Sequence, residues 1–200
     1  MDKFAKMKIG ILGGSFNPIH NGHLILADEV RQKLNLDKIF FIPVHLPVHK
    51  EQKDLLDALT RFKMVKMAVK DNPYFQALDI EIKRKGRSYT IDTLKNLRLL
   101  YPEVKKFFFI VGSDALGYLN SWKDINQVMK LAKFVVGLRP GYPFKNLPKD
   151  ILALTIESID ISGFRLRQRI KNGESVRYYM PREVCNYIMK KGLYVASSTK

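Results

Sequence analysis

The amino-acid sequence predicts an α/β protein built on a doubly wound parallel sheet with helices on both faces. Runs of consecutive Ile, Val, Leu and Phe recur along the chain, and such runs are typical of strands buried on both sides of a parallel sheet. Amphipathic helical patterns lie between these runs. Because strand and helix alternate, the chain is expected to wind through right-handed crossovers.

The elements follow from these patterns in chain order. The predicted strands are Lys8–Leu12, Lys38–Pro43, Phe75–Ile82, Lys106–Gly112, Lys133–Leu138 and the weaker Leu152–Ile156. The predicted helices with clear bounds are His23–Leu34, Thr90–Leu100 and Pro181–Lys191. A further helix is predicted where Leu55, Leu59, Phe62, Val65 and Val69 recur at helical spacing. No repeat, low-complexity tract or linker interrupts them, which favours a single domain over residues 1–200 with its core at about 7–195.

The composition limits the class of protein. No stretch approaches the ~20 apolar residues of a membrane span, and Met1–Lys6 does not begin a secretory signal. The single cysteine, Cys185, excludes an internal disulfide; we expect it to pack on the apolar side of the last helix of a cytoplasmic protein. The formal net charge of +16 suits either a nucleic-acid binder or an enzyme with phosphorylated substrates. Scattered lysines without arginine–aromatic ladders disfavour nucleic acid, and the sequence leaves open whether the chain forms a homo-oligomer.

The segment after the first predicted strand carries the most specific pattern. Residues 13–23 read Gly-Gly-Ser-Phe-Asn-Pro-Ile-His-Asn-Gly-His and lead into a helix. Ligands of open parallel sheets bind beyond the carboxyl ends of the strands, where glycines and a helix N-terminus accommodate phosphate. His20 and His23 are three residues apart, so both can point to one site and donate hydrogen bonds to phosphate oxygens. Gly22 leaves room for a nucleotide between them.

Other interpretations of this segment are weaker. Isolated histidines are more often surface or packed residues, and a zinc pair lacks further Cys and His residues at metal-ligand spacing. The glycines do not have the G-x-G-x-x-G spacing, and a Walker lysine is absent.

Residues 13–23 resemble the (H/T)xGH motif of the nucleotidyltransferase superfamily, which implies a Rossmann-like sheet. Further segments resemble the bacterial nicotinate mononucleotide adenylyltransferases, namely Pro47–Lys50 (PPHK), Ser88–Leu94 (SYTxDTL), Gly112–Asp114 with Trp122 (GxD…W), Arg139–Gly141 (RPG), and Arg177–Pro181 with Leu193–Tyr194 (RYxxP…LY). These matches run in order over nearly the whole chain. A pantetheine-phosphate adenylyltransferase would lack most of them, and a class I tRNA synthetase would need a KMSKS loop.

The resemblance implies transfer of the adenylyl group of ATP, with Mg²⁺, to nicotinate mononucleotide, giving deamido-NAD and pyrophosphate in NAD biosynthesis. It assigns catalysis to His20 and His23, with no metal bound by protein side chains. The implied ATP-binding residues are Gly13, Gly14, Ser15, Phe16, Gly22, Gly112, Asp114, Ser162 and Arg167. The implied mononucleotide-binding residues are Asn17, His49, Lys50, Ser88, Thr90, Trp122 and Arg139.

Several of these residues also have a physical interpretation of their own. Lys50 and Arg139 follow strands and suit phosphate, Asp114 suits ribose hydroxyls, and Trp122 either stacks on the pyridine ring or packs in the core. Ser88 and Thr90 are predicted as N-caps of the helix that follows, with Asp92 in its first turn. His45 has no motif match and is interpreted as a polar loop residue.

One segment departs from the family pattern. Where the family has ISSTxIR, this chain has Ile-Ser-Gly-Phe-Arg-Leu-Arg at residues 161–167, so Gly163 and Phe164 replace Ser and Thr. Ser162 is predicted to cap a helix whose free N–H groups, together with Arg167, hold the outer phosphates of ATP. The alternative is a basic nucleic-acid-binding protein on an adenylyltransferase scaffold that has lost its activity.

Overall fold

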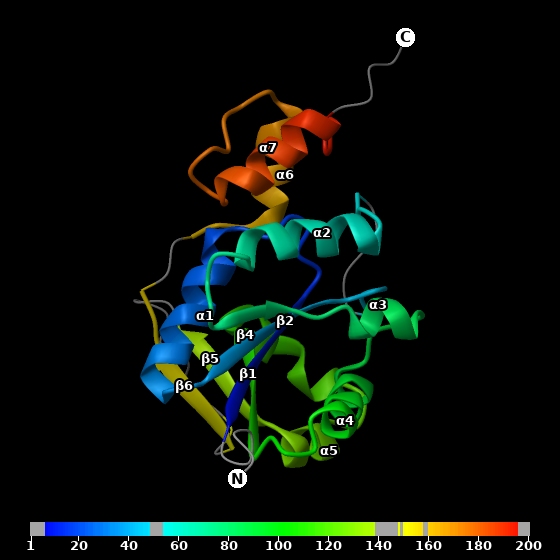
Figure 1. The fold of residues 1–200 in the computed structure, drawn as a ribbon, viewed down its shortest axis with the longest axis vertical. Coiled ribbons are helices and arrows are strands. Elements are labelled where there is room, and N and C mark those ends of the chain that lie inside the picture. Colours follow the sequence, from blue (N-terminus) through cyan, green and yellow to red (C-terminus); the bar gives the residue numbers. More distant parts are fainter. Residues whose placement is uncertain (1–6, 49–53, 139–147, 149, 158–159, 196–200) are drawn as a thin grey trace.

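A six-stranded sheet with strand order β3-β2-β1-β4-β5-β6, in which all neighbours are parallel, organises the chain (Figure 1). The computed structural model describes residues 7–48, 54–138, 148, 150–157 and 160–195. The strands are β1 (Lys8–Gly14), β2 (Lys38–Pro43), β3 (Phe75–Ala77), β4 (Lys106–Gly112), β5 (Lys133–Leu138) and β6 (Ile151–Thr155). The order reverses beside β1, which confirms the prediction of a doubly wound, Rossmann-like sheet.

The helices connect these strands and extend the chain beyond the sheet. They are α1 (Asn21–Leu34), α2 (Ala58–Val69), α3 (Ile80–Arg84), α4 (Thr90–Leu100), the 3₁₀ segment η1 (Ser113–Ser121), α5 (Ile125–Leu131), α6 (Gly163–Lys171) and α7 (Arg182–Lys191). Among the described helices, none has the length and apolar character that a membrane crossing requires.

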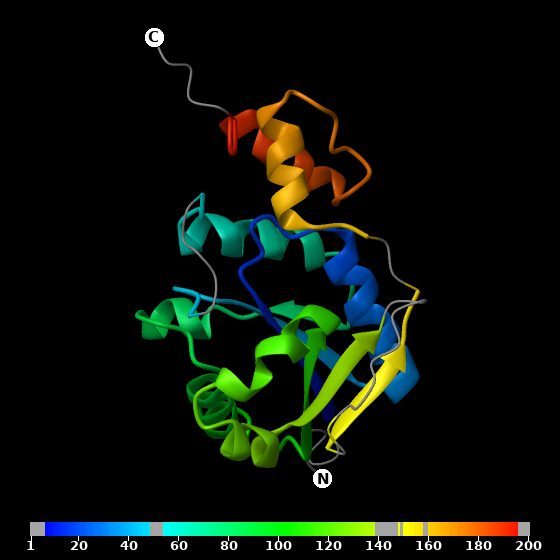
Figure 2. The same ribbon diagram turned by 180° about the vertical axis from the view of Figure 1, so that it is seen from behind.

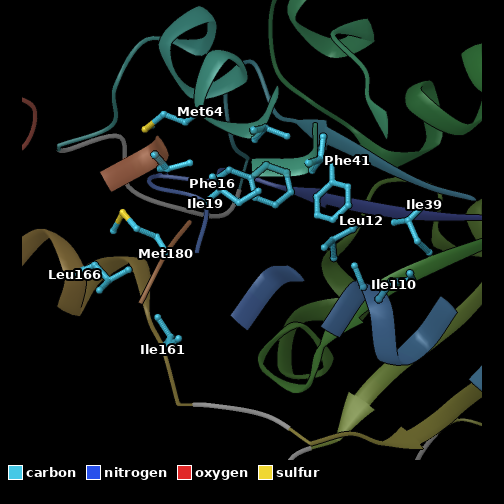
Figure 3. Close-up of a cluster of buried hydrophobic side chains, with 14 of the residues drawn as sticks. Leu12, Phe16, Ile19, Ile39, Phe41, Met64, Ile110, Ile161, Leu166 and Met180 are labelled. Carbon is cyan, nitrogen blue, oxygen red and sulfur yellow. The ribbon is translucent and has the colours of Figure 1, made fainter. Parts of the chain in front are cut away.

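Two hydrophobic clusters cover the two faces of the sheet and explain the continuous apolar runs. In β2, Ile39 and Phe41 belong to the cluster that α1, α2, α6 and α7 cover, part of which Figure 3 shows. The intervening Phe40 and Ile42 belong to the opposite cluster, which α4 and α5 cover. Successive side chains of a strand point to opposite faces, so a strand with two covered faces is apolar at every position.

The predicted strand Phe75–Ile82 is wrong over its second half. Only Phe75–Ala77 pairs with β2, and Ile80–Arg84 forms α3, with the Lys83 N–H donating to the Asp79 carbonyl at 2.9 Å. Ile80 and Ile82 are buried, but Glu81 between them is buried as well, so the apparent alternation does not separate an inner face from an outer one.

The predicted helix over residues 55–69 exists, but its start and its buried face differ. It begins after Asp57, whose carboxylate accepts a hydrogen bond from the Thr60 N–H at 2.9 Å and acts as the N-cap. Leu59 is largely exposed, whereas Arg61 lies in one buried stripe with Met64 and Val65. A charged residue therefore occupies a core position of α2.

The two C-terminal helices lie beyond α2, away from the sheet (Figures 1 and 2). Leu166 of α6 and Met180 before α7 belong to the same buried cluster as Phe16 and Met64, and Figure 3 shows these side chains near one another. Cys185 packs half-buried against this cluster, as predicted. The C-terminal helices therefore rest on the segment that follows β1.

Candidate functional site

A cleft of about 510 Å³ opens at the carboxyl ends of β1, β4 and β5, between the N-termini of α1, α4 and α6. Most of the residues singled out in the sequence line it, namely Gly13, Gly14, Ser15, Phe16, Asn17, His20, Gly22, His23, Ser88, Thr90, Gly112, Trp122, Ser162 and Arg167. His49, Lys50 and Arg139 lie outside the described residues. Asp114 is the second residue of η1, but its side chain is not among those described.

The two histidines stand together where α1 begins. His20 is the buried N-cap residue, and its ring stacks on that of His23 with centroids 3.7 Å apart. The backbone N–H of His20 donates to Nδ1 of His23 at 3.2 Å. A neutral imidazole that accepts at Nδ1 carries its proton at Nε2, so His23 retains an N–H donor. A Cβ at Gly22 would come within 3.1 Å of the His20 Nδ1, so the glycine allows this close pairing.

The turn between β1 and α1 packs on the core through the side chain of Phe16. Phe16 has a φ of 46°, and its ring is buried in the core, where it meets the His23 ring edge-on at 5.0 Å. The Asn17–Pro18 peptide bond is cis. Phe16 thus lines the cleft, and its ring supports that of His23.

Arg61, a residue of α2, holds this turn in place, although the sequence did not predict that role for it. Its side chain is fully buried, and three of its nitrogens donate to backbone carbonyls at 2.7–3.0 Å. The acceptors are Leu56, Ser15 and His45, which belong to three separate segments. Burial lowers the pKa of Arg61, and the charges of Tyr194, Asp57 and Glu81 oppose that shift. Its helical spacing from Met64 and Val65 was the feature of the sequence that could have predicted its burial.

The N-terminus of α6 closes the cleft from the other side. The Ser162 Oγ accepts from the Arg165 N–H at 3.5 Å, so the predicted N-cap is confirmed. A Cβ at Gly163 would lie 3.1 Å from the Asn17 carbonyl oxygen, to which Arg167 Nη1 donates at 2.9 Å. The Arg167 Nε is buried and has no hydrogen-bond partner in the described part of the chain. Phe164 is 61% exposed beside Arg167.

A second wall of the cleft joins the segment after β2 to the start of α4. The His45 N–H donates to Ser88 Oγ and the Ser88 N–H to the Leu46 carbonyl, both at 2.9 Å. The predicted capping by Ser88 and Thr90 is wrong, because Tyr89 is the N-cap residue and no side chain caps this helix. Ser88 instead ties two segments together. Asp92 does lie in the first turn of α4, as predicted.

Glu81 lies behind this wall and was also missed. It is 5% exposed, and one carboxylate oxygen accepts from the Thr93 hydroxyl, whereas Oε2 has no hydrogen-bond partner among the described residues. Burial raises the pKa of Glu81 above its ordinary value, opposed by hydrogen bonds from Ser88 and Thr93 and by the charges of Arg84 and Arg61. A glutamate between two core isoleucines was the available signal.

Trp122 combines packing with access to the cleft. Its ring meets Phe109 and Phe134 edge-on, with centroids 5.8 Å away in each case. It is half-buried and lines the cleft, while its Nε1 has no hydrogen-bond partner in the described residues. The two interpretations of Trp122, packing and stacking on a ligand, are therefore compatible.

Comparison with known proteins identifies relatives over nearly the full length. A family model described as cytidylyltransferase-like matches residues 11–169. A protein of Dehalococcoides mccartyi strain BAV1 named probable nicotinate-nucleotide adenylyltransferase is 40% identical over 200 residues, which cover 95% of this chain and 98% of that protein. One of the same name from Enterococcus faecalis is 40% identical over 190 residues, 95% of this chain and 86% of that protein.

Solved structures share the fold. Nicotinic acid mononucleotide adenylyltransferase of Plasmodium falciparum complexed with NaAD superimposes with a TM-score of 0.75 at 21% identity, covering 94% of this chain and 97% of its own. The same protein complexed with APC gives a TM-score of 0.76 at 21% identity over the same shares.

Proposed function

This chain belongs to the nicotinate-nucleotide adenylyltransferase family, and from that premise we propose how its cleft transfers the adenylyl group of ATP to nicotinate mononucleotide. The products are deamido-NAD and pyrophosphate, so the reaction is a step of NAD biosynthesis. The observation that carries the proposal is the stacked pair of His20 and His23 beside the glycine turn at the end of β1.

The proposed reaction is a direct, in-line displacement. An oxygen of the mononucleotide 5′-phosphate attacks the α-phosphorus of ATP, the new P–O bond forms, and the bond to the β-phosphate oxygen breaks to release pyrophosphate. The attacking phosphate is already ionised at neutral pH, so no strong general base is required. Catalysis then depends on positioning the two substrates and on stabilising the charge that develops on oxygen.

His20 and His23 supply the stabilisation in this proposal. The Nε2–H left to His23 by its Nδ1 hydrogen bond is a neutral donor for an α- or β-phosphate oxygen. Stacking on His20 and the edge of Phe16 hold its ring in place before substrate arrives. The backbone of Gly13, Gly14 and Ser15 lies along the same phosphates.

The N-terminus of α6 receives the outer phosphates. Its first N–H groups lack intrahelical partners whatever side chains they carry, so the replacement of hydroxyls by Gly163 and Phe164 leaves an anion site. Arg167 keeps donors besides the Nη1 that binds Asn17. The close approach at Gly163 suggests that this chain has exchanged a hydroxyl for a tighter contact between α6 and the turn.

The pyridine mononucleotide occupies the α4 side of the cleft. The Ser88 Oγ already accepts from the His45 N–H, so the N–H groups that open α4 at Thr90 are the better donors for the nicotinate carboxylate. Trp122 offers its ring to the pyridine. We assign the mononucleotide phosphate to His49, Lys50 and Arg139, and the ATP ribose to Asp114.

Mg²⁺ enters as part of the substrate, bound to the phosphates of ATP. The only carboxylate among the described side chains that line the cleft is the buried Glu81, so we assign no protein side chain to the ion. We further propose that the enzyme works in the cytoplasm.

A coupled assay for pyrophosphate release with a panel of acceptors tests the function. With ATP and Mg²⁺, kcat/KM for nicotinate mononucleotide should exceed that for nicotinamide mononucleotide or phosphopantetheine by at least about tenfold, because donors built for a carboxylate are left unpaired by the other acceptors. Equal turnover of phosphopantetheine would contradict the acceptor assignment. Salt-sensitive retention of DNA without any pyrophosphate release would favour the inactive-scaffold alternative.

A further inference from the structure

We propose that Tyr194, the last aromatic residue of the chain, is a positioning residue that fixes the nucleotide-binding turn through Asn17. This inference rests on the proposed function, because it assigns the turn a part in adenylyl transfer. Tyr194 follows α7 and touches none of the cleft itself, whereas Asn17 lines the cleft between the glycines and His20.

Asn17 is the point at which distant parts of the chain meet. It is 7% exposed, and its side-chain oxygen accepts from the Tyr194 hydroxyl at 2.7 Å and from the Leu56 N–H at 3.3 Å. Its side-chain nitrogen donates to the Asp54 carbonyl at 2.8 Å. Its backbone carbonyl accepts from Arg167 at 2.9 Å. The side chain of Asn17 is thus held by hydrogen bonds before a ligand arrives.

The Tyr194 bond is the strongest candidate for a positioning role among these contacts. It is buried, it is the shortest hydrogen bond to the Asn17 side chain, and it links residues 177 apart. Among the described partners of the Asn17 side chain, Asp54 and Leu56 use their backbone, so Tyr194 alone offers a side chain whose loss can be tested without altering the main chain.

Tyr194 makes this contact from an uncommon backbone conformation. Its φ is 64°, a left-handed conformation that a residue with a large side chain rarely adopts. The ring is nevertheless buried and the hydroxyl faces Asn17. Burial raises the pKa of Tyr194 against the opposing charges of Arg167 and Arg61, so the hydroxyl stays a neutral donor throughout the working pH range.

Rigidity of the turn matters because its two ends serve different parts of the reaction. Ser15 lies on the glycine side and is held by Arg61, and His20 is the N-cap residue of α1 on the other side. Asn17 lies between them. A turn that can shift changes the distance between the phosphate backbone site and the histidines, and such misplacement lowers the chemical rate more than ground-state binding.

The decisive variant is Tyr194→Phe, which keeps the ring and removes only the hydroxyl. We expect kcat to fall by about three- to thirtyfold, less than the hundredfold that a 1 Å misplacement can cause, with both KM values within about twofold of wild type. The fall should be the same from pH 6 to 9. Tyr178→Phe is the matched control, since Tyr178 is 83% exposed and lies outside the cleft, and it should leave kcat unchanged.

A second variant tests the same bond from its other end. In an Asn17→Ala background the acceptor is gone, so adding Tyr194→Phe should lower kcat no further. Two effects that multiply independently would overturn the proposal, as would a Tyr194→Phe enzyme with wild-type kcat. Thermal unfolding of each variant separates a positioning effect from partial unfolding at the assay temperature.

A readout without catalysis keeps this inference separate from the proposed function. Amide hydrogen exchange over residues 15–17 should be faster in Tyr194→Phe than in wild type or in Tyr178→Phe. Unchanged exchange would overturn the positioning role even in an active enzyme. If the wild-type protein does not transfer the adenylyl group, but exchange over residues 15–17 is still faster in Tyr194→Phe, the proposed function is contradicted and the positioning role of Tyr194 is supported.

Discussion

Arg61→Lys is the substitution for which the structure predicts the largest loss of stability from an apparently conservative change. The guanidinium reaches three carbonyls, of Leu56, Ser15 and His45, with three different nitrogens in one plane. A lysine ammonium carries its three N–H donors on a single nitrogen, so it can reach one of these carbonyls but cannot span all three. Two charge-assisted hydrogen bonds are therefore lost, and two carbonyls are left without their donor.

The magnitude follows from those two bonds. At about 1.5–3 kcal/mol for each charge-assisted bond, the free energy of unfolding should fall by about 3–6 kcal/mol. That is a large part of the ~5–15 kcal/mol of a typical domain. At about 2–4 °C per kcal/mol for a chain of this size, the melting temperature should fall by at least about 6 °C.

Equilibrium urea unfolding at 25 °C and pH 7, followed by circular dichroism, measures the change. Arg165→Lys is the control, because Arg165 pairs with Asp160 at 2.8 Å while both side chains are more than half exposed, and exposed pairs contribute about 0–1 kcal/mol. If Arg61→Lys unfolds within about 1 kcal/mol of wild type, Arg61 does not hold the three segments together as we describe.

Four further predictions concern the cleft. His23→Ala should lower kcat by roughly 10²–10³-fold, the usual effect of losing one preorganised donor, whereas His45→Ala should change it by less than about fivefold; similar effects in both would contradict the assignment. Saturating nicotinate mononucleotide should quench the fluorescence of Trp122, the single tryptophan, and an unchanged spectrum would leave it a packing residue. Burial raises the folded-state pKa of Glu81, so its contribution to stability is present at low pH and is lost as the pH rises. The Glu81→Gln variant should therefore gain stability relative to wild type as the pH increases above about 4.5. In urea unfolding from pH 4 to 8, a constant difference between the two proteins would mean that burial does not destabilise the ionised carboxyl. Gly163→Ser places a Cβ at 3.1 Å from a backbone oxygen, so it should raise KM for ATP by up to about tenfold, and steady-state kinetics that show tighter ATP binding would mean that α6 has room for the family residue.

The sequence alone predicted most of the sheet and the residues that line a cleft at the ends of its strands. The apolar runs of β1, β2, β4 and β5 were long enough to predict strands buried on both faces, because a doubly covered strand needs apolar residues at every position. The carboxyl ends of parallel strands meet at one edge, so residues that follow different strands, such as Gly14 and Gly112, were expected in one cleft. Ser162 was recognisable because an N-cap acts on its own helix.

Contacts between distant segments could not be predicted from the same patterns. Ser88 follows the local rule for an N-cap, yet its hydroxyl bonds to His45, which only the parallel pairing of two loops brings near. The length of a short edge strand depends more on its neighbours than on its own sequence. For this reason the alternation after Phe75 wrongly predicted a strand over the residues that form α3.

The buried polar residues show most clearly where sequence ends and tertiary structure decides. Arg61 and Glu81 occur at the spacing of core positions, but both are charged residues, which are usually exposed. A prediction from the sequence alone therefore places both side chains on the surface. Their burial is stable because carbonyls and hydroxyls of other segments converge on them, and that convergence exists only in the folded chain. The sequence by itself thus determined the strands of the sheet, apart from the extent of β3, and the residues that line the cleft at the end of β1. Only the tertiary structure decided which buried groups, Arg61, Arg167 and Tyr194 among them, hold the turn at that end, because each makes its bond to a residue more than forty positions away.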